Sequence, residues 1–349
     1  MSDVAVLERP VAAAPALPAP YLLFLGDTTE PGYAKTAFGL RDWAGDKCLG
    51  EFALPAATVT TGLPRLSPAE ARALGAGAMV IGVANPGGVI PSAWVPALVA
   101  ALELGMDLVA GMHARLADMP ALVDAARRGG ARLHDLRTPP AGLPIGSGRK
   151  RTGKRLLTVG TDCALGKKYT ALAIARGLTA RGHDATFRAS GQTGIMIAGE
   201  GIAIDAVIAD FAAGASELLS PDAAPDHWDV IEGQGSLFHP SYAAVSLALL
   251  HGSQPDLFIV CHQPGRTAIL GHPGYTLPTI GAVIEATVAM GRLTNPAIRC
   301  AGVSLNTDGM AEDEADAAIA AAAREAGLPA ADPLRGGAAF ERLLDAIVG

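Results

Sequence analysis

Short apolar runs alternate along the first part of the chain with segments of helical period. The apolar runs predict buried strands at 21–26, 79–84, 107–111 and 131–136. The segments of helical period predict helices at 92–104 and 120–130. Because strands that alternate with helices form a parallel sheet with helices on its faces, we predict an α/β fold with a Rossmann-like domain here.

The second part of the chain repeats this alternation. Strands are predicted at 156–160, 184–189, 228–232, 257–262 and 298–307, and helices at 167–178, 311–326 and 338–348. A segment rich in Pro, Gly and basic residues, 139–155, separates the two parts and is typical of a linker. We expect its basic cluster, Arg149 to Arg151, to form a solvated turn, the alternative being a contact to a bound phosphate.

The strand at 156–160 leads into a turn between two glycines, then Lys167 and an Ala- and Leu-rich helix. This order is that of a phosphate-binding loop, in which backbone N–H groups, a helix N-terminus and a lysine surround an anion. An ordinary strand-to-helix turn is the alternative. We predict a flexible N-terminal arm over 1–20, a Rossmann-like domain over 21–145, and a P-loop domain with a mostly parallel sheet over 146–349.

The loop departs from the standard motif in two ways. Five residues rather than four separate Gly160 from Gly166, and Lys168 stands where the motif has the Ser or Thr that binds Mg²⁺. The hydroxyl of Thr170 lies two positions further along the helix and faces another way. The loop therefore favours phosphate binding over Mg·ATP hydrolysis. The predicted cofactor-binding residues are Gly160, Thr161, Asp162, Cys163, Ala164, Gly166, Lys167, Lys168 and Tyr169.

Composition narrows the class of protein. Half of the 349 residues are hydrophobic, 17% are charged and 5% are aromatic, as in a tightly packed α/β protein. The net charge of −7 argues against binding to nucleic acid or anionic membranes, and no run approaches the ~20 apolar residues of a membrane span. The four cysteines form no CxxC pair, so neither a zinc site nor a disulfide framework is indicated. The N-terminal residues lack the features of a signal peptide, and we expect a cytoplasmic protein.

Polar residues follow each predicted strand of the second domain. They are the glycine loop at 190–194, Glu232, the segment 262–266 and Asn306. Because the carboxyl ends of parallel strands meet at one edge of the sheet, we expect these residues to share a crevice with the P-loop. A carboxylate placed like Glu232 holds a metal ion or positions a nucleophile in P-loop proteins, although it could instead cap a helix. His272, in Gly-His-Pro-Gly, is expected to lie in a turn.

Several motifs resemble known families. Gly-Thr-Asp at 160–162 with Gly-Lys at 166–167, Gln-Thr-Gly at 192–194 and Glu-Gly-Gln-Gly at 232–235 are similar to the dethiobiotin-synthetase branch of P-loop proteins. A narrower match adds Asn-Pro-Gly-Gly at 85–88, His-Pro at 239–240 and Ser-Leu-Asn-Thr at 304–307. With these motifs, the chain from residue 21 onward resembles the family of D-glutamate N-acetyltransferases.

The resemblance implies transfer of an acetyl group from acetyl-CoA to the amine of a D-amino acid. It implies that this amino acid is D-glutamate and that the reaction belongs to D-amino-acid catabolism. Amine acetylation needs a base for the ammonium proton, donors for the oxyanion, and cations for the substrate carboxylates. The candidate bases are Glu232, His239 and His262. The candidate substrate-binding residues are Arg188, Gln192, Arg266 and Asn306. No metal ligand is assigned, and a role for Mg²⁺ is left open.

Other interpretations stay open. Cys163, in the loop at a helix N-terminus, could carry the acetyl group as a thioester or could be a small packed loop residue. The alternative functions are an ATP-dependent ligase or kinase of the dethiobiotin-synthetase type and a nucleotide-sensing switch. The expected partners are acetyl-CoA and a small D-amino acid, with no nucleic acid and no membrane. The apolar composition favours a homo-oligomer.

Overall fold

The computed structural model describes residues 17–349, and the chain forms two compact units. Of the described residues, the Rossmann-like unit contains 17–139 together with Ile195–Ala203. The P-loop unit is made of Pro140–Gly194 and Ile204–Gly349, so a short segment inside its chain belongs to the other unit. Most of the arm expected over 1–20 lies outside the described residues.

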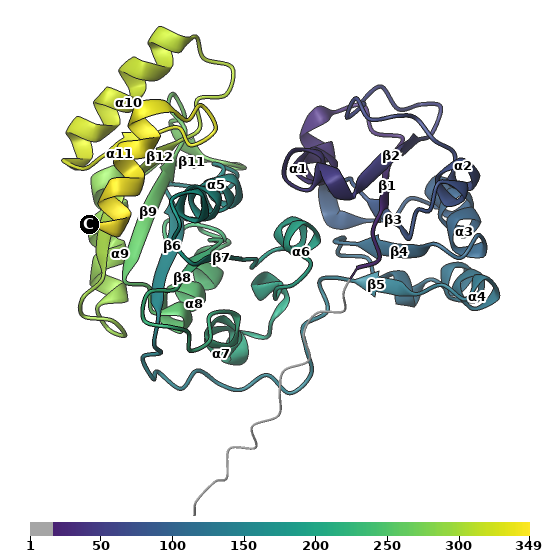
Figure 1. Cartoon of the computed structure of the whole chain (residues 1–349), viewed down its shortest axis with the longest axis horizontal. Helices are drawn as coiled ribbons and strands as arrows, with labels where there is room; N and C mark the ends of the chain where they lie inside the picture. The colour runs from purple at the N-terminus through teal and green to yellow at the C-terminus, as the bar shows by residue number, and fades with distance from the viewer. Residues whose placement is uncertain (1–16) are drawn as a thin grey trace, which may run out of the picture. The chain divides into compact units, whose positions relative to one another are not determined.

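Five parallel strands form the sheet of the Rossmann-like unit in the order β2-β1-β3-β4-β5. They are β1 (Tyr21–Gly26), β2 (Cys48–Ala53), β3 (Ala78–Ile81), β4 (Asp107–Ala110) and β5 (Leu133–Asp135). One face carries α1 (Lys35–Trp43), and the other carries α2 (Pro68–Ala73), α3 (Val95–Glu103) and α4 (Pro120–Gly129) (Figure 1). This strand order is that of flavodoxin-like doubly wound sheets, with the reversal between β1 and β3.

Six parallel strands form the sheet of the P-loop unit in the order β13-β12-β9-β6-β8-β7. They are β6 (Lys154–Gly160), β7 (Ala185–Arg188), β8 (Trp228–Ile231), β9 (Leu257–His262), β12 (Arg299–Leu305) and β13 (Ala330–Ala331). A separate antiparallel hairpin joins β10 (Ala268–Ile269) to β11 (His272–Thr276). The strand order reverses between β6 and β9, so the turns that follow these two strands lie side by side.

Helices cover both faces of this second sheet. Figure 1 shows α5 (Lys167–Ala180) and α11 (Gly337–Val348) on one face and α8 (Ala243–Ser253) and α9 (Ile280–Gly291) on the other. The remaining helices are α6 (Gln192–Ala198), α7 (Ala209–Leu219) and α10 (Glu312–Ala326). The predicted α/β class, with a Rossmann-like and a P-loop part, is confirmed.

Two local expectations differ from the structure. The glycine loop expected over 190–194 is partly helical, because α6 begins at Gln192. His272 was expected in a turn, and this is wrong because it is the first residue of β11, where the hairpin places its ring beside a second histidine.

The basic cluster at 149–151 lies at the amino-terminal edge of the P-loop sheet. A solvated turn fits exposed Arg149 but is wrong for Arg151, which is only 6% exposed. Its guanidinium donates to Ser220 O and Gly252 O, both at 2.7 Å, where α7 and α8 end. Carbonyls at a helix C-terminus lack partners within the helix and favour a nearby cation. The alternative of a phosphate contact is also wrong, since β6 separates the cluster from the P-loop by roughly 20 Å.

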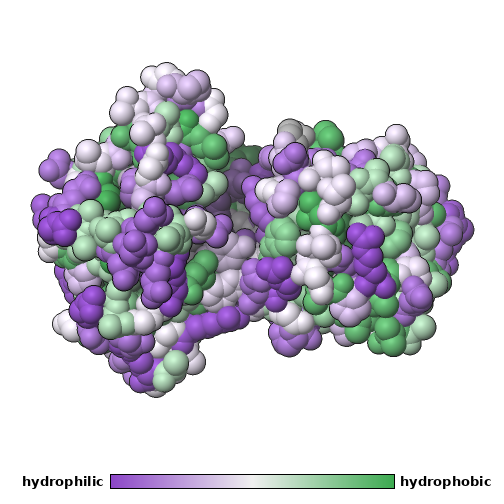
Figure 2. All heavy atoms as spheres, turned by 90° about the horizontal axis from the view of Figure 1, so that it is seen from above, coloured by the Kyte–Doolittle hydropathy of each residue, from purple (hydrophilic) through white to green (hydrophobic). Residues whose placement is uncertain are grey.

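Hydrophilic and hydrophobic residues are intermixed over the face seen in Figure 2. Within residues 17–349, no helix is both long enough and apolar enough to cross a membrane.

Candidate functional site

The P-loop joins the carboxyl end of β6 to the start of α5, as predicted. Two of its residues have positive φ angles, Ala164 at 54° and Gly166 at 95°. Left-handed residues turn successive amides toward one side of the backbone, which creates a concave surface of N–H groups. Gly166 has the residue type that this conformation favours, whereas Ala164 adopts it at a steric cost.

The loop has more hydrogen-bond donors than acceptors. Lys167 is 7% exposed, and its ammonium donates to Asp162 O at 2.7 Å, which uses one of its three N–H groups. Within the described chain, the backbone amides of residues 164–167 have no hydrogen-bond partner. Burial lowers the pKa of Lys167. Unpaired amides beside a cation at the N-terminus of a helix are the geometry of an anion-binding site.

The structure offers no hydroxyl at the Mg²⁺-binding position of the loop. Lys168 occupies that position, and its ammonium lies 4.7 Å from the ring centre of Tyr169. The hydroxyl of Thr170 is buried and shares a 2.7 Å hydrogen bond with Ser304 on β12. Thr170 therefore faces the sheet, as the helical spacing predicted.

Asp162 links the P-loop to the segment that follows β9. Its fully buried carboxylate accepts from Cys163 N at 2.6 Å, from Leu270 N at 2.7 Å and from Arg266 Nη1 at 2.9 Å. The same Nη1 donates to Cys163 O at 2.8 Å, and Nη2 donates to Gln263. Arg266, a candidate for substrate binding, is thus engaged with the loop itself.

Glu232 follows β8 at the same edge of the sheet. Its Oε2 accepts from Ser190 N at 3.1 Å and Gly191 N at 3.2 Å, so the carboxylate lies beside the start of α6. Burial raises the pKa of Glu232 to about 7, against the opposing effects of Lys168 and these two amides. The next residue in the chain is a glycine, Gly233, because a Cβ at this position would collide with the backbone oxygen of Thr158 on β6. A carboxyl with this pKa can both accept and release a proton near neutral pH.

The two candidate histidines differ in what they offer. His239 is 2% exposed, and its Nδ1 accepts from Ser241 N at 3.1 Å, which leaves the proton on Nε2. His262 ends β9, its Nδ1 lies 3.1 Å from the hydroxyl of Thr161, and burial lowers its pKa. Among these candidates, burial brings the pKa of the Glu232 carboxyl up to neutral pH and lowers the pKa of His262.

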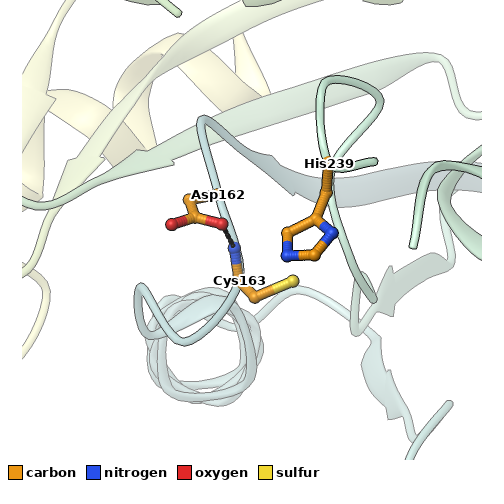
Figure 3. A group of neighbouring side chains, drawn as sticks. All are labelled: Asp162, Cys163 and His239. Atoms are coloured by element: carbon orange, nitrogen blue, oxygen red, sulfur yellow. Dashed lines mark hydrogen bonds between the residues drawn. The ribbon is translucent and has the colours of Figure 1, made fainter. Parts of the chain in front are cut away.

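Asp162, Cys163 and His239 form a cluster whose possible ligand atoms all lie within 4.8 Å of one another (Figure 3). These are residue types that bind transition metals. The hydrogen bonds count against that use, because Nε2 carries the proton and both oxygens of Asp162 already accept N–H groups. The nearby cations Lys167 and Arg266 would also repel a metal ion.

The other candidate substrate-binding residues are spread along the edge. Arg188, at the end of β7, donates to buried Asp229 at 2.6 Å. Gln192 is the first residue of α6, next to the amides that bind Glu232. Asn306 follows β12, and its backbone amide donates to His262 O at 2.9 Å. The predicted crevice residues therefore lie at the carboxyl ends of neighbouring strands, with the side chains of Arg188 and Arg266 already paired to carboxylates.

An aromatic group surrounds His239 that was not predicted from the sequence. The ring of Tyr242 stacks on His239 with centres 4.5 Å apart, and His272 meets it edge to face at 5.1 Å. Tyr275 in turn contacts His272 at 5.9 Å. Only the tertiary fold brings β11 to the loop after β8, so the one signal available was the presence of two His-Pro pairs, at 239–240 and 272–273.

Comparisons with known proteins agree with this two-part architecture. Residues 144–344 match the family described as "Domain of unknown function (DUF1611_C) P-loop domain", and residues 50–139 match "Domain of unknown function (DUF1611_N) Rossmann-like domain". A crystal structure of a DUF1611 family protein from Anabaena variabilis ATCC 29413 is 34% identical, covers 94% of this chain and 99% of its own, and superimposes with a TM-score of 0.85.

Two curated relatives carry functional names. A "D-glutamate N-acetyltransferase" of Tritonibacter scottomollicae is 49% identical over 94% of this chain and 98% of its own length. A protein of the same name from a Pseudoalteromonas species is 46% identical over 91% of this chain and 96% of its own length. By these matches, the chain belongs to the DUF1611 family, in which a Rossmann-like domain precedes a P-loop domain.

Proposed function

We propose that this protein transfers the acetyl group of acetyl-CoA to the amine of D-glutamate, in D-amino-acid catabolism. The N-acetyltransferase class follows from two full-length relatives of that name at 46–49% identity. The donor, the amino acid and the metabolic role are the parts that we propose.

The observation that carries the proposal is the surplus of donors at the P-loop. Residues 164–167 present amides without partners, and Lys167 has two N–H groups that no described residue accepts. Coenzyme A carries a pyrophosphate group, which suits such a cradle. Because Lys168 replaces the Mg²⁺-binding hydroxyl, the loop can hold the pyrophosphate without arranging a metal for phosphoryl transfer.

The chemistry requires a base near neutral pH, and we assign this role to Glu232. The ammonium of the amino acid must lose a proton before its nitrogen can attack the thioester carbonyl carbon. Glu232, with a pKa of about 7, accepts that proton at its carboxylate. His239 presents an N–H at Nε2, which can donate to the developing oxyanion. Collapse of the tetrahedral intermediate breaks the C–S bond, and the second proton passes from the nitrogen to the departing sulfur, so that the products are the neutral amide and CoA as the free thiol.

A first experiment tests the reaction. The protein is incubated with acetyl-CoA and each of a panel of D- and L-amino acids, and free thiol is followed with time. We expect thiol release with D-glutamate and little with L-glutamate. Release that depends on ATP and yields ADP would overturn the proposal in favour of a ligase or kinase. Binding of nucleotide without turnover of any amino acid would favour a sensing switch.

A second experiment tests the role of the loop. Lys167→Ala removes hydrogen bonds to a phosphate, which are worth about 1.5–3 kcal/mol when charged, so kcat/KM for acetyl-CoA should fall roughly 10- to 150-fold. S-acetylpantetheine lacks the pyrophosphate, and its kcat/KM should change little in the same variant. An equal loss with both donors would show that Lys167 does not act through the phosphates.

The expected homo-oligomer and cytoplasmic location remain predictions. Light scattering on the purified protein tests the first, and fractionation of cells tests the second.

A further inference from the structure

Two segments beside the P-loop carry exposed apolar side chains. One is the loop that follows β8, with Phe238 and Tyr242, and the other is the β10–β11 hairpin, with Leu270 and Tyr275. These four side chains, which we call the apolar patch, are 38–54% exposed. Single exposed apolar side chains are common on protein surfaces, whereas several on segments that contact each other are typical of a binding surface.

Contacts between rings hold the two segments together. The ring of His272 meets that of His239 edge to face at 5.1 Å, and its Nε2 lies 3.4 Å from the hydroxyl of Ser241. Tyr242 stacks on His239, and Tyr275 contacts His272, so the four rings form a continuous row. The two tyrosines at the ends of this row are each 54% exposed. A surface fixed in this way loses little conformational entropy when a ligand covers it.

The apolar patch adjoins the anion-binding loop. Leu270 N donates to Oδ2 of Asp162 at 2.7 Å, and the same oxygen accepts from Arg266, in the segment that leads into the hairpin. Figure 3 shows the ring of His239 beside Asp162 and Cys163, and their possible ligand atoms all lie within 4.8 Å of one another. A ligand whose phosphates lie in the loop can therefore reach the patch directly.

The patch is also connected to the candidate base. The loop after β8 begins directly after Glu232, and its Gln234 donates from Nε2 to the hydroxyl of Ser190 at 3.0 Å. The backbone amide of Ser190 in turn donates to the Glu232 carboxylate. The apolar patch is thus joined at one end to the phosphate cradle and at the other to Glu232.

We propose that the apolar patch binds the pantetheine arm of the cofactor, an inference that rests on the proposed function. The arm links the pyrophosphate to the thioester, so it must cross from the P-loop to Glu232 when the thioester meets the amine. It consists of methyl and methylene groups around two amides. Leu270 and the tyrosine rings suit the carbon chain, and the tyrosine hydroxyls can form hydrogen bonds with the amides.

A pair of ligands separates the arm from the phosphates. Coenzyme A is compared in isothermal titration with 3′-phospho-ADP, which is coenzyme A without its pantetheine arm. Leu270→Ser with Tyr275→Ser removes apolar surface but keeps the backbone amide that binds Asp162. Because each side chain is about half exposed, coenzyme A should bind the double variant roughly 10- to 100-fold more weakly. Its affinity for 3′-phospho-ADP should stay within about twofold.

Leu293→Ser is the matched control. Leu293 is 70% exposed and follows α9 at the amino edge of the same sheet, so both affinities should stay within about twofold. An equal loss with both ligands in the double variant would show that the change disturbs the P-loop, and no loss with either would show that the arm binds elsewhere. Both results would overturn the inference. Unmodified protein that binds neither ligand would instead contradict the proposed function, and the inference with it.

Kinetics with S-acetylpantetheine give a second readout. This donor keeps the arm, so its KM should rise in the double variant while kcat stays within about twofold, the reverse of the small change expected for it in Lys167→Ala. An unchanged KM would overturn the inference. Light scattering on the same samples distinguishes a contact between copies of the chain: a lower mass in the double variant, with unchanged affinity for coenzyme A, would assign the patch to that contact and overturn the inference.

Discussion

Arg155 and Lys167 are buried cations at opposite edges of one parallel sheet. Arg155, near the start of β6, is fully buried, and its five N–H donors reach five different backbone carbonyls: those of Arg151, Thr152, Gly153, Ser220 and Pro221. Lys167, just after the other end of β6, has one such acceptor. The two residues are similarly buried, yet only one of them has its hydrogen bonds complete.

The difference separates a structural charge from a functional one. At the amino edge, Glu217 also has partners, since its carboxylate accepts from the amides of Ser147 and Gly148. At the carboxyl edge, Glu232 has two amide partners as well, but burial still raises its pKa to about 7. A fold that leaves donors unpaired and a carboxyl near its titration point gives up stability, and ligand binding or catalysis is the physical reason to retain them.

Replacement of Glu232 should have the largest effect on activity. Glu232→Gln removes the base and should lower kcat/KM about 10²- to 10⁴-fold. In the unmodified enzyme the rate should rise with pH through about 7, because the base acts in its ionised form. The variant should lose this rise. The measurement is a pH profile of thiol release from acetyl-CoA with D-glutamate.

Glu217→Gln is the matched control, because its carboxylate also accepts two backbone amides. It lies at the other edge, so kcat/KM should stay within about twofold and the midpoint of the profile should not move. If Glu232→Gln behaved like this control, one of the histidines would have to serve as the base.

The next largest effect should come from replacing Arg155, the cation whose hydrogen bonds are complete. Arg155→Met leaves several carbonyls without donors, and we expect a loss of about 3 kcal/mol in the free energy of unfolding. Lys167→Met removes a buried charge with a single hydrogen bond, so stability should change by less than about 1 kcal/mol or should rise. Urea denaturation of the two variants in parallel measures both. Equal losses would mean that the two cations do not differ in the way their hydrogen bonds indicate.

The same contrast explains what the sequence could predict. The strand, the glycines and the lysine of the P-loop are consecutive, so local pattern was enough to place Gly160, Gly166 and Lys167. Arg151 is also close to the loop in sequence, but β6 carries it to the other edge, where it joins helix ends that are 69 and 101 positions away. Such partners are set by the tertiary fold and leave no local signal.

Helices were missed for a related reason. The segment of α8 is Ala, Val and Leu in most positions, so it has no polar face to show a helical period. The short apolar runs predicted strands correctly where glycines and polar turns marked the ends of each run. The pairing of His239 with Cys163 and His272 could not be predicted, because these residues come from three separate loops and strands.

Replacement of Lys168 should have the smallest effect on activity, and the effect should be a shift of the pH profile. Its charge lowers the pKa of Glu232, in opposition to burial. Lys168→Met removes that charge, so the pKa of Glu232 should rise and the rising limb of the pH profile should move to higher pH. Lys154→Met is the control, since Lys154 also lies over an aromatic ring, that of Trp228, but at the amino edge. The midpoint of the pH profile should not move in Lys154→Met. A shift in the control, or none in Lys168→Met, would show that the limb reports a group other than Glu232.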